Sequence, residues 1–300
     1  MNIGWIGAGK MGMPMMASLM AAGHSVSLYE PTDSARQQAQ ALGATLAQSP
    51  ADAARRVQAV FSSLPDDAAL LAVAPAVFEG TAPGGLYVDT STVSPQASAT
   101  VARAAQAAAV RYLRAPVSGT PVQAHERALT TIVSGPRDAF EAAQPLLSQW
   151  GPNLRYVGQQ EQARSMKLVL NLMVGATAAM MAEALALGSK GGIRWNDLLD
   201  VMASSALASP LLKVKAAQLR QRDFSPLFSC GQMAKDLRLI LAAGSDADVP
   251  LPLAALVSQL NAISLAHGRG DEDYIASVLT AEMLAATGPV LDGDDTDDSR

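Results

Sequence analysis

Three glycines near the start of the chain are spaced as a phosphate-binding turn requires. Gly7, Gly9 and Gly12 form a G-x-G-x-x-G pattern directly after a strand-like run at residues 3–6, and a helix-like run follows them. In such a turn the first glycine makes the bend, the second leaves room for a pyrophosphate, and the third lets helix and strand pack closely. The N–H groups and the positive end of the helix would face the phosphates. We therefore predict a dinucleotide site here, with Met11 among its residues.

Two further features belong to the same predicted site. Glu30 closes the second strand-like run, where a carboxylate can accept hydrogen bonds from both ribose hydroxyls and would repel a 2′-phosphate. NAD is therefore expected in preference to NADP. The turn at Leu64 and Pro65 ends the third strand. Because the carboxyl ends of strands line the crevice of a doubly wound sheet, we expect this turn to pass under the cofactor.

The elements that would position these residues alternate along the first half of the chain. Short apolar runs separated by helix-like stretches are typical of a mostly parallel sheet covered on both faces, an α/β doubly wound fold. The expected strands are residues 3–6, 25–29, 59–63, 86–89, 111–113, 130–133 and 154–157. The expected helices between them are residues 11–22, 34–42, 96–109 and 138–149.

The second half of the chain has helix-like runs and no strand-like run. The proline-free stretch at 162–190 predicts one long helix, and glycines and prolines separate the later runs. Those runs are residues 195–204, 210–221, 229–243, 253–267 and 273–286. The long helix is apolar, but Asn171, Thr177 and Glu183 interrupt it and no aromatic belt flanks it. We expect a helix buried between domains or subunits, and no membrane span.

Composition and charge narrow the class of protein. Of 300 residues, 49% are hydrophobic and 16% charged, which excludes a disordered chain, and a net charge of −5 argues against a nucleic-acid partner. The single Cys230 and the strand-like start fit a cytoplasmic, reducing location. The three histidines are scattered, so no metal site is expected. The apolar long helix indicates a homodimer or homotetramer.

The expected organisation has four parts. Residues 1–161 would form a dinucleotide-binding Rossmann-type domain, and residues 162–190 an interdomain helix. Residues 191–288 would form an all-helical C-terminal domain. The acidic residues that dominate 289–300 predict a disordered tail.

Four segments between residues 2 and 285 together resemble the β-hydroxyacid dehydrogenase family, which includes 3-hydroxyisobutyrate dehydrogenase and tartronate semialdehyde reductase. They are the glycine turn followed by MPM at 13–15, DTSTVSP at 89–95, APVSGT at 115–120, and a fourth with Lys167, Asn171, Phe228 and MAKDL at 233–237. The family patterns they resemble are G-x-G-x-M-G-x-x-M, D-x-S-T-x-x-P, D-A-P-V-S-G-G, K-x-x-x-N and F-x-x-x-L-M-x-K-D-L. Their common order and spacing make the resemblance specific.

The resemblance implies a Rossmann-type domain, a long linking helix and an all-helical C-terminal domain. It implies hydride transfer between a nicotinamide cofactor and a small 3-hydroxy acid or semialdehyde, and it assigns Lys167 as the general acid/base beside Asn171. Apolar neighbours lower the pKa of a lysine toward the range useful for proton transfer. Asn171 lies one helical turn further on and projects from the same face, so it can orient the amine.

The resemblance also implies the positions that contact substrate and cofactor. Around the substrate it places Ser118, Gly119 and Thr120, where small residues let backbone N–H groups face a carboxylate. Near the nicotinamide it places Thr92 and Lys235. Two plainer roles remain open: Thr92 could cap the following helix together with Asp89, and Lys235 could form a surface pair with Asp236.

Three positions depart from the family's pattern. Arg114 stands where an aspartate is usual, Thr120 replaces the second glycine of S-G-G, and Arg127 replaces a common glycine. The two arginines either recognise a second anion or point to solvent. The substrate is therefore expected to be a less usual member of its class.

Two alternative functions remain open. An imine reductase would have a similar architecture but usually lacks the lysine found here as Lys167. A non-catalytic dinucleotide-binding sensor would have no need of the pair formed by Lys167 and Asn171.

Overall fold

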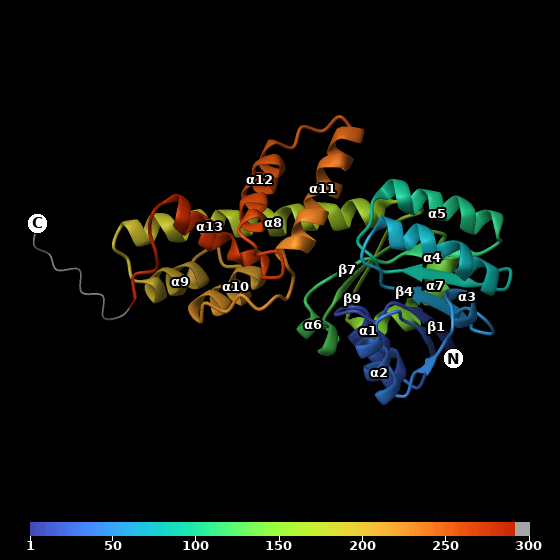
Figure 1. Ribbon diagram of the computed structural model, residues 1–300. Helices are drawn as coiled ribbons and strands as arrows, with labels where there is room; N and C mark the ends of the chain where they lie inside the picture. The colour runs from blue at the N-terminus through green and yellow to red at the C-terminus, as the bar shows by residue number, and fades with distance from the viewer. Residues whose placement is uncertain (292–300) are drawn as a thin grey trace, which may run out of the picture. The chain divides into compact units, whose positions relative to one another are not determined.

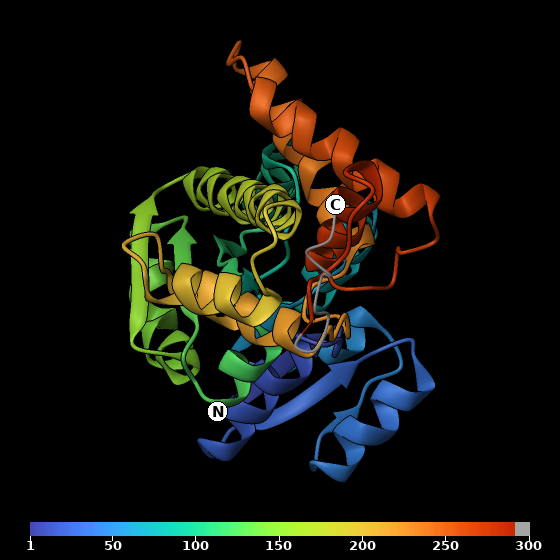
Figure 2. The same cartoon turned by 90° about the vertical axis from the view of Figure 1, so that its left-hand side faces the viewer.

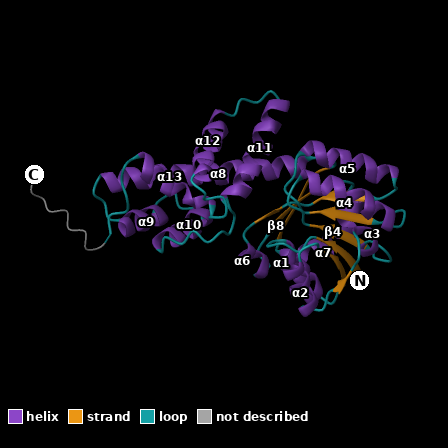
Figure 3. Ribbon diagram, in the orientation of Figure 1, coloured by secondary structure: helices purple, strands orange, loops and turns teal. Residues whose placement is uncertain are grey.

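The computed structural model describes residues 1–291 of a chain that divides into two compact units, Met1–Leu168 and Val169–Arg300. Among the described residues, strands occur only in the first unit, whereas the second is built from helices (Figure 3). This confirms the expected fold class, a Rossmann-type α/β sheet with a long helix and an all-helical C-terminal part. The acidic tail expected at 289–300 lies outside the described residues from position 292 onward.

The first unit contains one nine-stranded sheet. Its strands are β1 (Asn2–Ile6), β2 (Ser25–Tyr29), β3 (Thr45–Leu46), β4 (Ala59–Ser62), β5 (Leu86–Asp89), β6 (Arg111–Arg114), β7 (Val117–Ser118), β8 (Thr130–Ser134) and β9 (Asn153–Gly158). The order is β3-β2-β1-β4-β5-β6-β8-β7, with β9 paired to β8. Neighbours from β3 to β6 are parallel, while β8 runs antiparallel to β6 and β7. Because the chain order reverses beside β1, the turns after β1 and β4 meet at the switch point where doubly wound sheets bind ligands.

Helices cover both faces of this sheet, with α4 and α5 on one face and α1 and α2 on the other (Figure 1). The helices of this unit are α1 (Gly12–Ala21), α2 (Asp33–Ala41), α3 (Pro50–Ala53), α4 (Asp67–Gly80), α5 (Pro95–Ala107), α6 (Pro121–His125) and α7 (Arg137–Leu147), with a 3₁₀ turn at Ser148–Trp150. Two cores result from the alternation of side chains along the strands. On one face Trp5 stacks on Phe61 with ring centroids 5.5 Å apart, and on the other Tyr87 stacks on Tyr112 at 5.4 Å.

Several short elements of this unit are absent from the sequence-based expectation. β3 and β7 have two residues each, too few to show a period of two, and α3 and α6 have four and five. The longer helix α4 was also missed because Pro75 lies inside it, although Asp66 caps its start by accepting a hydrogen bond from the Ala69 amide at 2.9 Å. The capping role left open for Asp89 and Thr92 is taken by another residue, because Ser94 accepts from the Ala97 amide at the start of α5 at 3.0 Å.

The helix α8 (Gln162–Lys190) has 29 residues and the bounds expected from the sequence. In the part of the chain that the structure describes, it is the one helix long and apolar enough to cross a membrane, and 39% of its most apolar window is buried. The division between the two units falls within this helix. Its first turns belong with the sheet, because Arg164 is hydrogen-bonded to Asp89, the last residue of β5, and to Ser91 just after it.

The second unit consists of helices and contains a buried ion pair. These helices are α9 (Trp195–Ser204), α10 (Pro210–Arg220), α11 (Cys230–Asp246), α12 (Pro252–Ala266) and α13 (Ser277–Leu284), with a 3₁₀ turn at Tyr274–Ala276. α11 and α12 lie side by side, as do α9 and α10 (Figure 1, Figure 2). Lys215 Nζ lies 2.7 Å from Asp273 Oδ1, and burial lowers the pKa of this lysine against the opposing effect of the carboxylate. Asp273 also accepts from the Leu227 amide at 3.0 Å, so one carboxylate joins three segments of the unit.

Candidate active site

The glycine turn after β1 is tight at both ends and open in its middle. Gly7 has φ +86°, and a Cβ there would lie 2.4 Å from the Ser63 carbonyl oxygen. A Cβ at Gly12 would lie 2.3 Å from the carbonyl oxygen of Gly7, so helix α1 packs on the turn only because this residue has no side chain. A Cβ at Gly9 would meet nothing within 4 Å. The turn therefore fits a pyrophosphate held against its central backbone, at the N-terminal end of α1.

Glu30 places a fixed negative charge beside this turn. Its side chain is nearly buried, with Oε2 accepting from the Ala8 amide at 2.7 Å and Oε1 from the Thr32 amide at 2.8 Å. The carboxylate therefore joins the end of β2 to the glycine turn. Each oxygen keeps a further lone pair with which it can accept a ribose hydroxyl.

The turn after β4 is held by residues that follow β5. The Leu64 amide donates to Ser91 Oγ at 2.8 Å, and that hydroxyl donates to Asp89 Oδ1 at 2.6 Å. Ser62 Oγ donates to the same carboxylate oxygen at 2.6 Å. Leu64 is half-buried and Pro65 is exposed. The turn predicted to pass under a cofactor is therefore held at the Leu64 amide, while Pro65 is accessible to solvent.

Arg164 fastens the first turn of α8 to this same group. Its guanidinium is fully buried, forms an ion pair with Asp89, and donates to the Ser91 carbonyl at 2.6 Å and to the Tyr112 hydroxyl at 3.0 Å. Burial acts to lower the pKa of Arg164, but Tyr112 and Asp89 outweigh it and raise that pKa, so the charge is permanent. Lys167 lies three residues further along the helix, is half-buried, and belongs to the sheet unit.

Asn171, one turn beyond Lys167, is oriented by a buried carboxylate. Its side chain is 5% exposed, and its Nδ2 donates to Asp236 Oδ2. Lys235 Nζ lies 3.0 Å from the other oxygen of Asp236. The carboxylate engages the amide nitrogen of Asn171, so the amide oxygen is the group with which Asn171 can accept a further hydrogen bond. Lys235 and Asp236 do form the pair left open as an alternative, but Asp236 is buried and the pair is not a surface one.

The expected carboxylate loop at Ser118, Gly119 and Thr120 joins β7 to the short helix α6. Gly119 has φ +143°, and a Cβ there would lie 2.5 Å from a Leu129 methyl carbon. Thr120 forms a capping box: its hydroxyl accepts from the Gln123 amide at 3.3 Å and its own amide donates to Gln123 Oε1 at 2.9 Å. The threonine that replaces the family's second glycine therefore stabilises the start of α6.

The two unusual arginines have different surroundings. Arg114 does not point to solvent: its side chain is 6% exposed, it pairs with Glu161, and its Cζ lies 4.7 Å from the centre of the Tyr112 ring. Arg127 is exposed, has φ +55°, and borders a shallow pocket of about 170 Å³ with His125.

Sequence reasoning missed four residues of this arrangement: Asp89 as an acceptor for three side chains, Arg164, Glu161 and Asp236. A signal existed for Asp89 and Asp236, which lie in segments that resemble family motifs, whereas nothing local marks Arg164 or Glu161. Across residues 1–291 the structure contains no group of three or more metal-ligating side chains.

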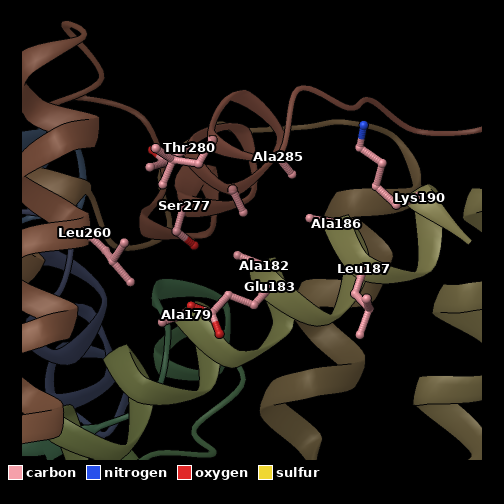
Figure 4. A pocket seen from close by; sticks show the side chains of 12 residues that line it. Ala179, Ala182, Glu183, Ala186, Leu187, Lys190, Leu260, Ser277, Thr280 and Ala285 are labelled. Carbon is pink, nitrogen blue, oxygen red and sulfur yellow. The ribbon is translucent and has the colours of Figure 1, made fainter.

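A second cavity, of about 410 Å³, lies within the helical unit between α8, α12 and α13 (Figure 4). It is lined by Ala182 and Ala186 of α8, Leu260 of α12 and Thr280 of α13, and Lys190 lies at its edge. Its walls are mainly apolar and it contains none of the predicted site residues.

The comparisons with known proteins agree with the geometry of the first unit. Residues 2–158 match the family described as the NAD binding domain of 6-phosphogluconate dehydrogenase. Residues 162–280 match the family described as NAD-binding of NADP-dependent 3-hydroxyisobutyrate dehydrogenase.

Three known dehydrogenases or reductases are similar to this chain over almost their full length. The chain is 31% identical to 2-(hydroxymethyl)glutarate dehydrogenase of Eubacterium barkeri over 287 residues, 94% of this chain and 95% of that protein. It is 29% identical to glyoxylate/succinic semialdehyde reductase 1 of Arabidopsis thaliana, covering 93% and 97%. The crystal structure of 3-hydroxyisobutyrate dehydrogenase from Salmonella typhimurium superposes with a TM-score of 0.85 at 27% identity, covering 93% and 99%. The chain therefore belongs to the β-hydroxyacid dehydrogenase family and is an NAD(P)-dependent oxidoreductase.

Proposed function

We propose that this enzyme transfers hydride between a nicotinamide and a small 3-hydroxy acid or its semialdehyde, with Lys167 as the general acid/base. The observation that carries the proposal is the anchoring of α8: Arg164 fixes the helix to the end of β5 and the turn after it, and Lys167 follows on the same helix. The dehydrogenase and reductase names of the relatives support this substrate class.

Proton transfer accompanies the hydride. In the oxidising direction the neutral amine of Lys167 accepts the hydroxyl proton as the hydride leaves the alcohol carbon. In the reducing direction its ammonium donates that proton to the carbonyl oxygen and stabilises the negative charge that develops there. The bound nicotinamide supplies the hydride acceptor or donor. Asn171 is held by Asp236 through its amide nitrogen, and its assigned role is to accept a hydrogen bond from the ammonium or the substrate hydroxyl with its amide oxygen.

The substrate carboxylate is assigned to Ser118 and Gly119, with Thr120 shaping the loop through its capping box. Thr92 and Lys235 are assigned to the nicotinamide end. These assignments follow the family resemblance of their segments.

The cofactor is proposed to be NAD. The Glu30 carboxylate is fixed by two backbone amides, and a carboxylate in this position would accept the ribose hydroxyls and repel a 2′-phosphate. The nearest arginine in sequence, Arg36, forms an exposed pair with Asp33 at 3.1 Å.

The decisive experiment follows NADH absorbance with a panel of small 3-hydroxy acids and semialdehydes. We expect turnover by the wild type and a loss of about 10²–10⁴-fold in kcat for Lys167→Ala, the usual contribution of general acid/base catalysis. NADH binding by the variant, measured by fluorescence, should be unchanged. Tight NADH binding by a wild type that turns over none of the panel would favour the sensor, and turnover of cyclic imines alone would favour the imine reductase.

We also propose a cytoplasmic homo-oligomer, a dimer or tetramer, that needs no membrane or nucleic acid. The support is a row of exposed apolar residues at seven-residue intervals along α8, here named the α8 row: Met166, Met173, Met180 and Leu187. Side chains at this interval lie on one face of a helix, and a second copy of the chain offers the same face.

A further inference from the structure

Two ion pairs hold the start of α8 to the sheet. The pair of Arg164 with Asp89 is described above, and the second joins Arg114, the last residue of β6, to Glu161, which directly precedes the helix. Tyr112 lies between them: Arg114 Cζ is 4.7 Å from its ring centre, while its hydroxyl accepts from Arg164 at 3.0 Å. The pairs therefore form one connected cluster.

A third contact shows that this edge of the sheet holds the segment before α8 throughout. Ser134 is the antiparallel partner of Arg114 in the sheet. Its Oγ donates to the Gln160 carbonyl at 2.5 Å and accepts from the Ala163 amide at 3.1 Å. The ends of β6 and β8 thus fix residues 160–164, immediately before Lys167.

Burying the charges of Arg114 and Glu161 costs free energy, so stability alone does not explain why the pair is present. Arg114 is 6% and Glu161 18% exposed at the side chain. Within the described residues, Arg114 Nε and Glu161 Oε2 have no hydrogen-bond partner. A buried pair with unmet hydrogen bonds contributes little net stability, and a pair of neutral residues could fill the same space. Its geometric effect is clear: it ties the residue directly before α8 to the end of β6.

We propose that the Arg114–Glu161 pair is a positioning element that sets where α8 begins and so where the Lys167 amine lies. The aspartate usual in the family at position 114 could not pair with Glu161, so the two residues act as a matched set in this chain. The inference rests on the proposed acid/base role of Lys167. It also replaces the expectation that Arg114 binds a second anion of the substrate, because its charge is already paired.

The test uses Arg114→Gln, Glu161→Gln and the double variant, in the full-length enzyme. Each single variant leaves a buried charge unpaired and lowers stability, so the double variant is the informative one. It removes both charges, which leaves the net charge and the long-range field almost unchanged. Arg111→Gln is the matched control, because Arg111 begins the same strand and forms an exposed pair with Asp138 at 3.4 Å.

We expect the double variant to keep its melting temperature and its Kd for NADH, while kcat falls by between about tenfold and a hundredfold, as small misplacements of a reacting group do. The limb of the kcat–pH profile that depends on Lys167 should shift, whereas Arg111→Gln should match the wild type. A double variant with wild-type kcat and pH profile would overturn the inference.

A second measurement separates this inference from the proposed function. In a Lys167→Ala background, adding the two glutamine substitutions should leave the residual rate unchanged, because the positioned group is gone. Losses that multiply independently would show that the pair acts elsewhere and would overturn the inference. A fully active Lys167→Ala enzyme would instead overturn the acid/base role itself.

Discussion

At the scale of single residues, carboxylates do most of the organising. Glu30 joins the end of β2 to the glycine turn, Asp89 joins the turn after β4 to the start of α8, and Asp236 orients Asn171. Glu30 and Asp89 each accept hydrogen bonds from more than one segment of the chain, and Asp236 accepts from Asn171, which the proposed mechanism uses. Replacing any of them should therefore change geometry as well as charge.

Glu30 gives the sharpest prediction at this scale. Glu30→Gln keeps an oxygen that can accept from the Ala8 amide but removes the charge that repels a 2′-phosphate. We expect kcat/KM for NADPH relative to NADH to rise roughly tenfold, about 1.4 kcal/mol.

The control is Asp33→Asn, which makes the same chemical change three residues along at a side chain that is 85% exposed. Its cofactor ratio should stay that of the wild type. An unchanged ratio in Glu30→Gln would mean that another group selects the cofactor.

At the scale of elements, two glycines of the same turn have different roles: Gly12 is needed for packing, and Gly9 is expected to leave room for the cofactor. A methyl group at Gly12 would collide with backbone, whereas one at Gly9 would stand in open space where the pyrophosphate is expected. We predict that Gly12→Ala lowers the free energy of unfolding by roughly 1–3 kcal/mol, as overpacking does. Gly9→Ala should unfold like the wild type and bind NADH more weakly.

Thermal melting and NADH fluorescence titration of the two variants provide the check. Equal stability losses in both, or unimpaired NADH binding by Gly9→Ala, would contradict a phosphate site at the middle of this turn.

The elements also show what the sequence could reveal. The glycine turn, Glu30 and the helix at 162–190 depend on local patterns, and the structure has each in its expected element. The contacts of Arg164 with Asp89 and of Asn171 with Asp236 join residues 75 and 65 positions apart. No local pattern marks such pairs, because tertiary packing alone brings them together. The short β7 and α6 were missed for a related reason: two to five residues show no period.

At the scale of the whole molecule, α8 exposes apolar side chains to water, which is unfavourable for a single copy of the chain. A helix of 29 residues is about 43 Å long. Within the α8 row, Leu187 is 77% and Met173 61% exposed. Apolar rows of this kind are typical of an interface, so a single copy in water leaves favourable burial unused.

We therefore predict that Met180→Glu combined with Leu187→Glu lowers the molar mass in solution, measured by size-exclusion chromatography with light scattering. Charges brought together at a self-complementary interface repel each other and lose apolar burial. Leu71→Glu, at a 41% exposed position of α4, is the control and should keep the wild-type mass. A wild type that is already monomeric would contradict the proposed assembly.

The hydrogen-bonded path from the Leu64 amide through Ser91 and Asp89 to Arg164 has a wider consequence. The loop expected beneath the coenzyme and the helix that bears the amine share one continuous polar lattice. If coenzyme favours one arrangement of this lattice, that same arrangement must in turn favour coenzyme, because the linkage of binding free energies is reciprocal.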